Sequence, residues 1–274
     1  MDVNFFMRLY YMTNKDVKTI KKNTIKKDTI KKDKTKKEKL LIDKIYCIAL
    51  EKRLDYIKKT LINYYNFPKY KITFIKPYLK DKLNIDELIK NKMLYPNNNL
   101  SLGQIACYLS HYKCLNLFSK LNKENFLVFE DDIAQTNKNV IPKINTIIKN
   151  VPKNFDVIYL GRCFSKCYLD EKINEDLYKT KYSLCTHSMI ISKKGCKKIL
   201  KNLFPIKIPI DNLLGNLSYS GKLNSYASTE QIFEQKKEKN GKFKTSLDYS
   251  LDVKFPVCLS LAKEVSYFQY EFLR

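Results

Sequence analysis

The sequence predicts an α/β fold with a Rossmann-like βαβ pattern. Short apolar segments rich in β-branched and aromatic residues alternate along the chain with amphipathic segments of helical periodicity. One of these apolar segments, residues 126–129, stops at three consecutive acids, Glu130, Asp131 and Asp132. A buried parallel strand that ends in carboxylates delivers them to the crevice where open α/β sheets bind ligands.

Composition fits one substantial α/β domain and argues against a nucleic-acid binder. The chain has 274 residues, 44% of them hydrophobic, which is enough to build a core. Its formal net charge of +24 would favour polyanions or phosphorylated ligands, but the 52 basic residues are nearly all lysine, whereas phosphate readers favour the arginine fork. Abundant lysine with no tryptophan is typical of an AT-rich genome, so nucleic-acid binding is not expected.

Cysteine usage and hydropathy favour a cytosolic protein without a membrane span. The eight cysteines are scattered through apolar segments, where a free cysteine behaves as a small core hydrophobe, so we expect them to be reduced. No segment approaches the roughly 18 apolar residues of a transmembrane helix. Residues 1–12 begin with an acid, are interrupted by Asn4 and Arg8, and lack a small-residue cleavage site, unlike a signal peptide.

Residues 1–40 are expected to form a lysine-rich arm outside the folded domain. Residues 19–38 repeat a pentad as TIKKN, TIKKD, TIKKD and KTKKE, which cannot bury a continuous face and is expected to remain solvated. The alternative is that the arm holds the protein on a polyanion or an acidic partner. The domain itself is expected over residues 41–237, with 238–274 as an extension that packs on it.

The domain is expected to open with a strand, a helix and a second strand. Residues 44–50 have the pattern of a buried strand, 55–65 carry apolar side chains at helical spacing, and 70–75 are again strand-like. A weaker helix is predicted over 85–93.

A longer helix is predicted to start after Ser101. Ser101 and Gln104 have the spacing of a capping box, and apolar residues follow at helical intervals as far as Phe118. His111 lies inside this helix. It is either a hydrogen-bonded, partly buried histidine or a ligand or substrate contact.

The alternation of helix and strand continues beyond the acidic segment. A helix is predicted over 140–150 and a strand over 156–161. The apolar run 188–191 precedes Ser192, which can N-cap a helix that extends to Leu203.

The three acids after the central strand are suited to holding a divalent cation. Side chains two apart on an extended segment share a face, so Glu130 and Asp132 can point together while Asp131 points elsewhere. Crowded carboxylates repel each other, and Mn²⁺ or Mg²⁺, held with the help of substrate phosphates, relieves that repulsion. The alternative is a solvated acidic turn.

Five segments, in this order and at this spacing, resemble glycosyltransferase family 25. That family includes bacterial lipooligosaccharide galactosyltransferases and collagen hydroxylysine galactosyltransferases. The segments are LGQIACYLSH (102–111), LVFEDDI (127–133), YLG (159–161), THSMIISKKGCKKIL (186–200) and PID (209–211).

The resemblance implies a GT-A type, Rossmann-like nucleotide-sugar-binding domain with a mostly parallel central sheet. It also implies a UDP-sugar donor, a metal ion (Mn²⁺ or Mg²⁺), inversion at the anomeric carbon, and transfer of galactose or glucose to a glycan or a hydroxylysine-type protein acceptor. The family's motifs assign Glu130, Asp132 and His187 to the metal, Arg53, Ser110, Asp131 and Thr186 to the donor, and Asp211 and His111 to catalysis.

Inversion needs a base on the acceptor side of the sugar, away from the metal, which favours Asp211 over the strand-end acids. His111 and His187 are the competing bases. For two of these residues a structural role is the alternative: Asp211 can N-cap a helix, and His187 can be a histidine at the edge of the core.

Two residues on the expected nucleotide side depart from the family pattern. Ala49 stands where the family has Asn, and Tyr56 where it has Arg, although Arg53 matches. Two other functions therefore stay open. The chain can be a catalytically silent relative that serves as a binding module, or a polyanion binder that uses the lysine-rich arm.

Overall fold

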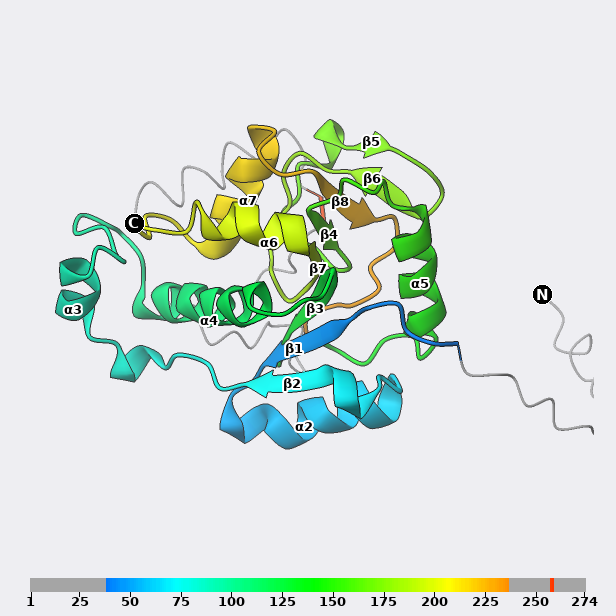
Figure 1. Cartoon of the computed structure of the whole chain (residues 1–274), viewed down its shortest axis with the longest axis horizontal. Coiled ribbons are helices and arrows are strands. Elements are labelled where there is room, and N and C mark those ends of the chain that lie inside the picture. The colour runs from blue at the N-terminus through cyan, green and yellow to red at the C-terminus, as the bar shows by residue number, and fades with distance from the viewer. Residues whose placement is uncertain (1–37, 237–256, 259–274) are drawn as a thin grey trace, which may run out of the picture. The chain divides into compact units, whose positions relative to one another are not determined.

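The computed structural model describes residues 38–236 and 257–258 (Figure 1). The expected lysine-rich arm, apart from Glu38, Lys39 and Leu40, and most of the expected extension 238–274 lie outside the described residues. Leu40 is already buried in the core.

The described residues form one sheet of eight strands in the order β2-β1-β3-β7-β4-β8-β6-β5. Strands β2, β1, β3, β4, β8 and β5 run in one direction, and β7 and β6 run in the opposite direction. The predicted α/β class with a mostly parallel central sheet is therefore confirmed. The strands are β1 Lys44–Ile48, β2 Ile72–Ile75, β3 Asn125–Glu130, β4 Val157–Tyr159, β5 Glu171–Lys172, β6 Leu177–Lys179, β7 Ser188–Ser192 and β8 Ser225–Ser228.

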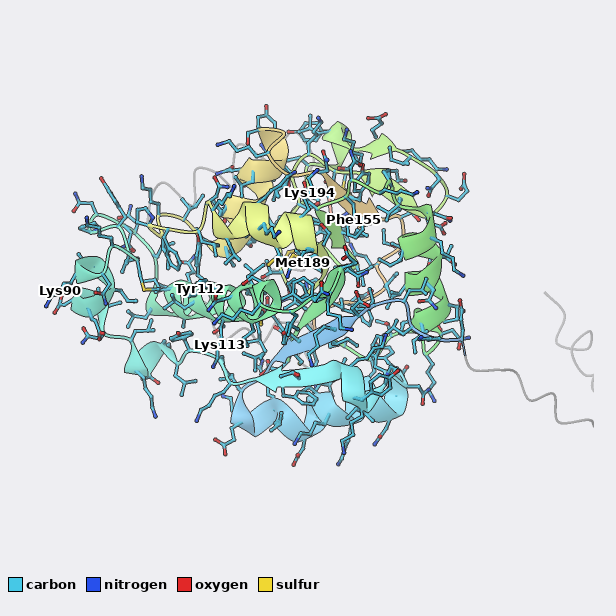
Figure 2. The ribbon with its side chains drawn as sticks, in the orientation of Figure 1. Lys90, Tyr112, Lys113, Phe155, Met189 and Lys194 are labelled. Carbon is cyan, nitrogen blue, oxygen red and sulfur yellow. A yellow bond between two sulfur atoms is a disulfide. The ribbon has the colours of Figure 1, made fainter. Side chains whose placement is uncertain are left out.

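Helices cover both faces of this sheet (Figure 1). Helices α4, α6 and α7 pack on one face, and α2 and α5 on the other. The α-helices are α2 Leu54–Lys58, α3 Ile85–Lys90, α4 Leu102–Ser119, α5 Val140–Asn150, α6 Lys193–Leu200 and α7 Ile210–Tyr219. In Figure 2, Met189 lies in the interior beside α4, whereas Lys90 and Lys194 project outward.

Strand β3 is the centre of the fold because both of its faces are buried. Phe126 and Val128 pack toward α4, and Leu127 and Phe129 toward α5. Each of the four is at most 1% exposed, and burying such a side chain stabilises the fold by about 1.5–3 kcal/mol. The strand therefore has a fixed register, which fixes the position of the acids at its end.

Local capping signals predicted the starts of α4 and α6 correctly, although α6 ends at Leu200 and not at the predicted Leu203. Ser101 Oγ accepts a hydrogen bond from Gln104 N (3.2 Å), and Gln104 Oε1 accepts one from Ser101 N (2.9 Å), which completes the capping box of α4. Ser192 Oγ caps α6 by accepting from Gly195 N at 3.0 Å. Helix α5 has the bounds that its periodicity predicts.

The helix expected over residues 55–65 differs from the prediction in its second half. Helix α2 gives way to a π-helical turn, Lys59–Tyr64, in which the hydrogen bonds span five residues instead of four, as from Tyr65 N to Thr60 O at 3.0 Å. Tyr65, which follows the turn, is buried, and its hydroxyl donates to Ala134 O at 2.7 Å. This contact with the segment after β3 could not be read from local periodicity.

The prediction that all cysteines are reduced is wrong. Disulfides join Cys163 to Cys185 and Cys167 to Cys258. Disulfides persist mainly in oxidising compartments, so they remove the support that reduced cysteines gave to a cytosolic location. The cysteines that are free, in line with the prediction, are Cys47, Cys107, Cys114 and Cys196. No helix in the described part of the chain is long and apolar enough to span a membrane.

Candidate active site

The candidate site lies at the edge of the sheet where β1 and β3 end. Strand β7 begins at this same edge because it runs antiparallel to β3. The segments that follow β1 and β3 and precede β7 therefore meet here, and Glu130 N–H donates to His187 O at 3.1 Å. This is the edge at which α/β sheets of this kind bind ligands.

Glu130 is held by one side chain from α4 and one from the approach to β7. His111 Nε2–H donates to Glu130 Oε1 at 3.1 Å, and the Thr186 hydroxyl donates to the same oxygen at 2.7 Å. Burial favours the neutral form of Glu130, but the hydrogen bond and charge of His111 and the bond from Thr186 outweigh it and hold the pKa of Glu130 below its usual value. The carboxylate is thus ionised and fixed in direction.

Asp131 points away from Glu130 and ties the acidic segment to the end of β1. Its Oδ2 accepts from Leu50 N at 2.6 Å and its Oδ1 from Arg53 Nη1 at 2.8 Å. Both partners are part of the loop and turn that follow β1. Because each of its carboxylate oxygens has a strong donor, Asp131 positions the backbone of this loop.

Among the three acids, Asp132 is the one whose carboxylate oxygens do not both have a hydrogen-bond partner in the described residues. Gln235 Nε2 lies 3.4 Å from its Oδ2, while its buried Oδ1 has no hydrogen-bond partner among the described residues. Burial, together with the charges of Glu130 and Asp131, raises the pKa of Asp132 to about 8. A buried carboxylate oxygen without a donor is costly, so this atom is suited to a cation or a ligand donor.

A segment from the far end of the described chain, residues 233–236, lies against the acids. Ile133 and Gln235 form an antiparallel bridge, and Lys236 N–H donates to Asp132 O at 2.5 Å. The Lys236 ammonium lies 4.0 Å from the centre of the Tyr56 ring, and the Tyr56 hydroxyl donates to Ile133 O at 3.0 Å. A lysine is thereby placed beside the acidic segment.

His187 is buried beside Gly161. Its Nε2–H donates to Phe233 O at 3.2 Å, and its Nδ1 has no hydrogen-bond partner in the described part of the chain. Burial lowers the pKa of His187, so the ring is neutral and Nδ1 carries a lone pair. A Cβ on Gly161 would lie 2.3 Å from His187 Nε2, so only glycine leaves room for the ring.

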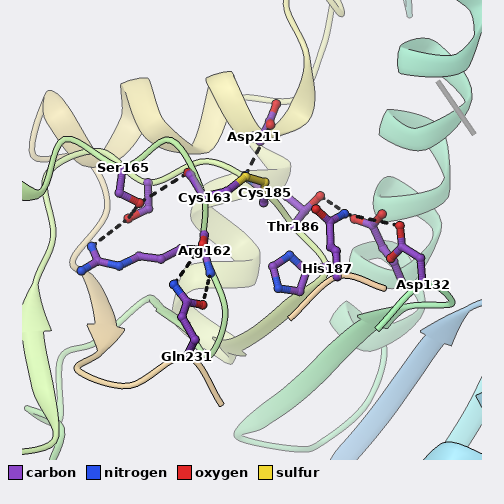
Figure 3. Close-up of a disulfide and its surroundings, with 12 residues drawn as sticks. Asp132, Arg162, Cys163, Ser165, Cys185, Thr186, His187, Asp211 and Gln231 are labelled. Carbon is purple, nitrogen blue, oxygen red and sulfur yellow. Dashed lines mark hydrogen bonds between the residues drawn. A yellow bond between two sulfur atoms is a disulfide. The ribbon is translucent and has the colours of Figure 1, made fainter. Parts of the chain in front are cut away.

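Asp211 lies in the first turn of α7 but does not cap it. The N-cap residue is Pro209, and no side chain caps the helix. Asp211 Oδ2 instead accepts from Cys185 N at 3.4 Å, and its Oδ1 from Asn212 N at 2.9 Å. Burial raises its pKa despite these two bonds. Figure 3 shows Asp211 joined to Cys185, the residue directly before Thr186.

Among the expected site residues, the structure brings His111 and Thr186 onto Glu130, and Arg53 onto Asp131. Ser110 instead faces its own helix. Its hydroxyl donates to Ala106 O (2.7 Å) and accepts from Tyr78 N (2.9 Å), and the residue is 1% exposed. These contacts join α4 to the loop after β2 and leave Ser110 little capacity for a substrate.

Cys107 and Gln235 are site residues that the sequence reasoning missed. Ligand atoms of Cys107, His111 and Glu130 all lie within 4.8 Å of one another. The four-residue spacing of Cys107 and His111 on α4 is a signal that could have found the first. Gln235 is 103 positions from Asp132, and no local pattern marks it.

Comparison with known proteins places the site inside a recognised family. A family model described as glycosyltransferase family 25 (LPS biosynthesis protein) matches residues 42–214. The chain is 27% identical to human procollagen galactosyltransferase 2 over 186 residues. This aligned region covers 63% of this chain and 30% of the human protein. It is 29% identical to Xenopus laevis procollagen galactosyltransferase 1-A over 156 residues, and this aligned region covers 54% of this chain and 25% of the Xenopus protein.

An insect protein extends the comparison. A glycosyltransferase 25 family member from Anopheles gambiae is 32% identical over 125 residues, 42% of this chain and 20% of that protein. The chain thus spans less than a third of the length of these curated relatives.

Proposed function

The chain belongs to glycosyltransferase family 25, and on that premise we propose that it transfers galactose or glucose from a UDP-sugar to a glycan or a hydroxylysine-type protein acceptor, with inversion. The observation that carries the proposal is the acidic end of β3, where Glu130 is fixed and ionised while a buried oxygen of Asp132 has no partner within residues 38–236 and 257–258. A purely structural acidic turn would have its carboxylates paired or solvated.

The residues present fit a divalent metal. Glu130 and Asp132 offer carboxylate oxygens, the ligands that Mn²⁺ and Mg²⁺ prefer, and His187 Nδ1, which has no hydrogen-bond partner among the described residues, is a third candidate. The ligand atoms that already lie within 4.8 Å of one another in the described residues are those of Cys107, His111 and Glu130, so binding by Glu130, Asp132 and His187 would require a movement of side chains. These residues would hold the cation where it could neutralise negative charge on the leaving diphosphate. The protein's part is to keep the carboxylates in place, which His111 and Thr186 do for Glu130.

The donor diphosphate is proposed to lie on the side of Arg53 and Lys236. Arg53 is tied to Asp131, and Lys236 lies over Tyr56, the position at which family members carry an arginine. A cation is therefore available near this position although the sequence lacks the arginine. This arrangement favours an active enzyme of the GT-A type over a silent relative.

Asp211 is proposed to be the general base. Its carboxylate is held by Cys185 N–H on a different element from the strand-end acids, as a base on the acceptor side requires. It would take the proton of the acceptor hydroxyl as that oxygen attacks the anomeric carbon. His111 directs Nε2 at Glu130 and is better placed to position that carboxylate than to act as the base.

The experiment that tests this function is a screen of UDP-sugars with the full chain. We expect Mn²⁺-dependent hydrolysis of UDP-galactose or UDP-glucose, and Mn²⁺-dependent thermal stabilisation by the same donor, because a ligand that binds only the folded state raises its stability. Stabilisation without hydrolysis or transfer would indicate a silent binding module. Absence of both effects across the panel would contradict the proposal.

A further inference from the structure

Two consecutive residues, Cys185 and Thr186, contact both carboxylates that the proposed reaction uses. Cys185 N–H donates to Asp211 Oδ2 at 3.4 Å, and the Thr186 hydroxyl donates to Glu130 Oε1 at 2.7 Å. Asp211 belongs to α7 and Glu130 to β3. The backbone of this dipeptide therefore links the proposed base to the proposed metal-binding acid (Figure 3).

Cys185 holds this position in an unfavourable backbone conformation. Its φ is 66°, in the left-handed region that residues with a Cβ rarely adopt. Phe164, on the facing segment, has a φ of 47°. Such conformations persist only where the surrounding structure over-determines them, and they concentrate at functional sites.

The Cys163–Cys185 disulfide and two backbone hydrogen bonds together hold the segment that contains Cys185. The disulfide joins two segments that also exchange backbone hydrogen bonds, Cys163 N to Leu184 O at 3.3 Å and Leu184 N to Cys163 O at 3.2 Å. Cys163 follows β4 and Cys185 precedes β7, and these two strands are antiparallel neighbours. The disulfide thus fastens the irregular ends of two paired strands immediately before Thr186.

We propose that the Cys163–Cys185 disulfide is a positioning element of the active site. It holds Cys185 in its left-handed conformation, and this places the Cys185 N–H on Asp211 and the Thr186 hydroxyl on Glu130. The inference rests on the proposed function, since it assigns a role to the cysteines in that reaction. Neither cysteine contacts substrate, and both act through the two carboxylates.

The second disulfide provides a matched control. Cys167 and Cys258 join the same loop to residues 257–258, beside the hydrogen bond from Ser165 N to Val257 O at 2.9 Å. None of the hydrogen bonds described for Asp211 and Glu130 comes from either cysteine. Loss of the Cys167–Cys258 disulfide therefore removes a cross-link of the same kind without disturbing Cys185 and Thr186.

The test compares the full chain with two double variants, Cys163→Ala/Cys185→Ala and Cys167→Ala/Cys258→Ala. Peptide mapping without reductant first establishes the pairing. Hydrogen–deuterium exchange over residues 183–188 and Mn²⁺-dependent hydrolysis of UDP-galactose are then measured well below the melting temperature. We expect the first variant to exchange faster over 183–188 and to lose kcat by about 10- to 100-fold, as misplaced catalytic groups do, while the second retains both properties.

A rescue variant separates geometry from general stabilisation. Cys163→Ala/Cys185→Gly also lacks the cross-link, but glycine adopts a positive φ without strain. It should therefore recover much of the lost kcat, although its melting temperature stays low. If the alanine pair does not fold, mild reduction of the Cys167→Ala/Cys258→Ala variant with dithiothreitol breaks the Cys163–Cys185 disulfide alone and gives the same comparison.

Several outcomes would overturn the inference. These are cysteines 163 and 185 found unpaired, exchange and kcat unchanged in the first variant, or equal losses in the two double variants. A wild-type protein that hydrolyses no UDP-sugar would instead contradict the proposed function, and hydrogen exchange would still decide whether the disulfide positions the segment.

Discussion

Thr186 donates a 2.7 Å hydrogen bond to Glu130, which joins the start of β7 to the end of the neighbouring strand β3. The two strands are antiparallel, so a residue that precedes one lies beside the residue that ends the other. His111 approaches the same carboxylate oxygen from α4. One sheet edge thereby collects polar groups from segments that are 19 and 56 positions from Glu130 in the sequence.

We first predict that Asp132→Asn abolishes Mn²⁺-dependent turnover without lowering the melting temperature. The substitution removes a ligand oxygen, but it also removes a carboxyl group whose ionisation burial and its two acidic neighbours disfavour. Donor hydrolysis and thermal melting check both parts. Unchanged turnover would remove Asp132 from the metal site.

Asp131→Asn is the matched comparison for that variant. Asp131 accepts from Leu50 N and Arg53, and weakening these charged hydrogen bonds should cost about 1–3 kcal/mol of unfolding free energy. We therefore expect the melting temperature to fall for Asp131→Asn and not for Asp132→Asn. The reverse order would show that Asp132 is the structural acid.

Features with a local cause could be predicted from the sequence, and features with a distant cause could not. The capping box of α4 depends on two residues three positions apart, and strand β3 on a run of apolar residues. The two disulfides depend on loops brought together by the sheet order, over separations of 22 and 91 residues. The contact of Gln235 with Asp132 has the same origin. The sequence and its family motifs therefore predicted the acids together with His111, Thr186 and Arg53, but not the approach of residues 233–236.

A second prediction concerns Lys236 as a donor contact. Lys236→Met should raise the KM for the UDP-sugar several-fold and change the melting temperature little, because the side chain is exposed and its one described partner is the Tyr56 ring. Lys143→Met is the control, since Lys143 pairs with Glu230 on the surface. Equal donor KM values in the wild type and Lys236→Met would exclude Lys236 from the diphosphate site.

A third prediction is that residues 1–37 are dispensable for turnover. A lysine-rich repeat without an apolar face adds little to a packed site. A chain that begins at Glu38 should fold and hydrolyse the donor at the wild-type rate. A chain that begins at Asp43 should be destabilised, because it loses the buried Leu40 and Ile42 and the hydrogen bond from Leu41 N to Asn145 Oδ1. Loss of activity in the Glu38 form would make the arm part of the catalytic domain.

The last prediction is that Asp211→Asn lowers sugar transfer by about 10² to 10⁴-fold, the usual contribution of a general base, and leaves the affinity for UDP nearly unchanged. Asparagine keeps one side-chain oxygen, which can accept from Cys185 N or from Asn212 N but not from both. The fold should therefore be kept, with a loss of about 1 kcal/mol of unfolding free energy for the missing hydrogen bond. What asparagine cannot do is take a proton from the acceptor hydroxyl. Transfer kinetics with an acceptor, UDP binding by calorimetry and thermal melting together separate these effects.

Replacing His111 or His187 by Asn tests the competing bases. His111→Asn should lower turnover with a matching loss of metal affinity, because His111 acts through Glu130. A loss of transfer from either histidine variant that exceeds the loss from Asp211→Asn, at unchanged metal and UDP affinity, would move the base to that histidine. A fall in melting temperature without a specific loss of transfer would instead make Asp211 a structural residue of the first turn of α7, whose burial already raises its pKa above that of an ordinary surface carboxyl.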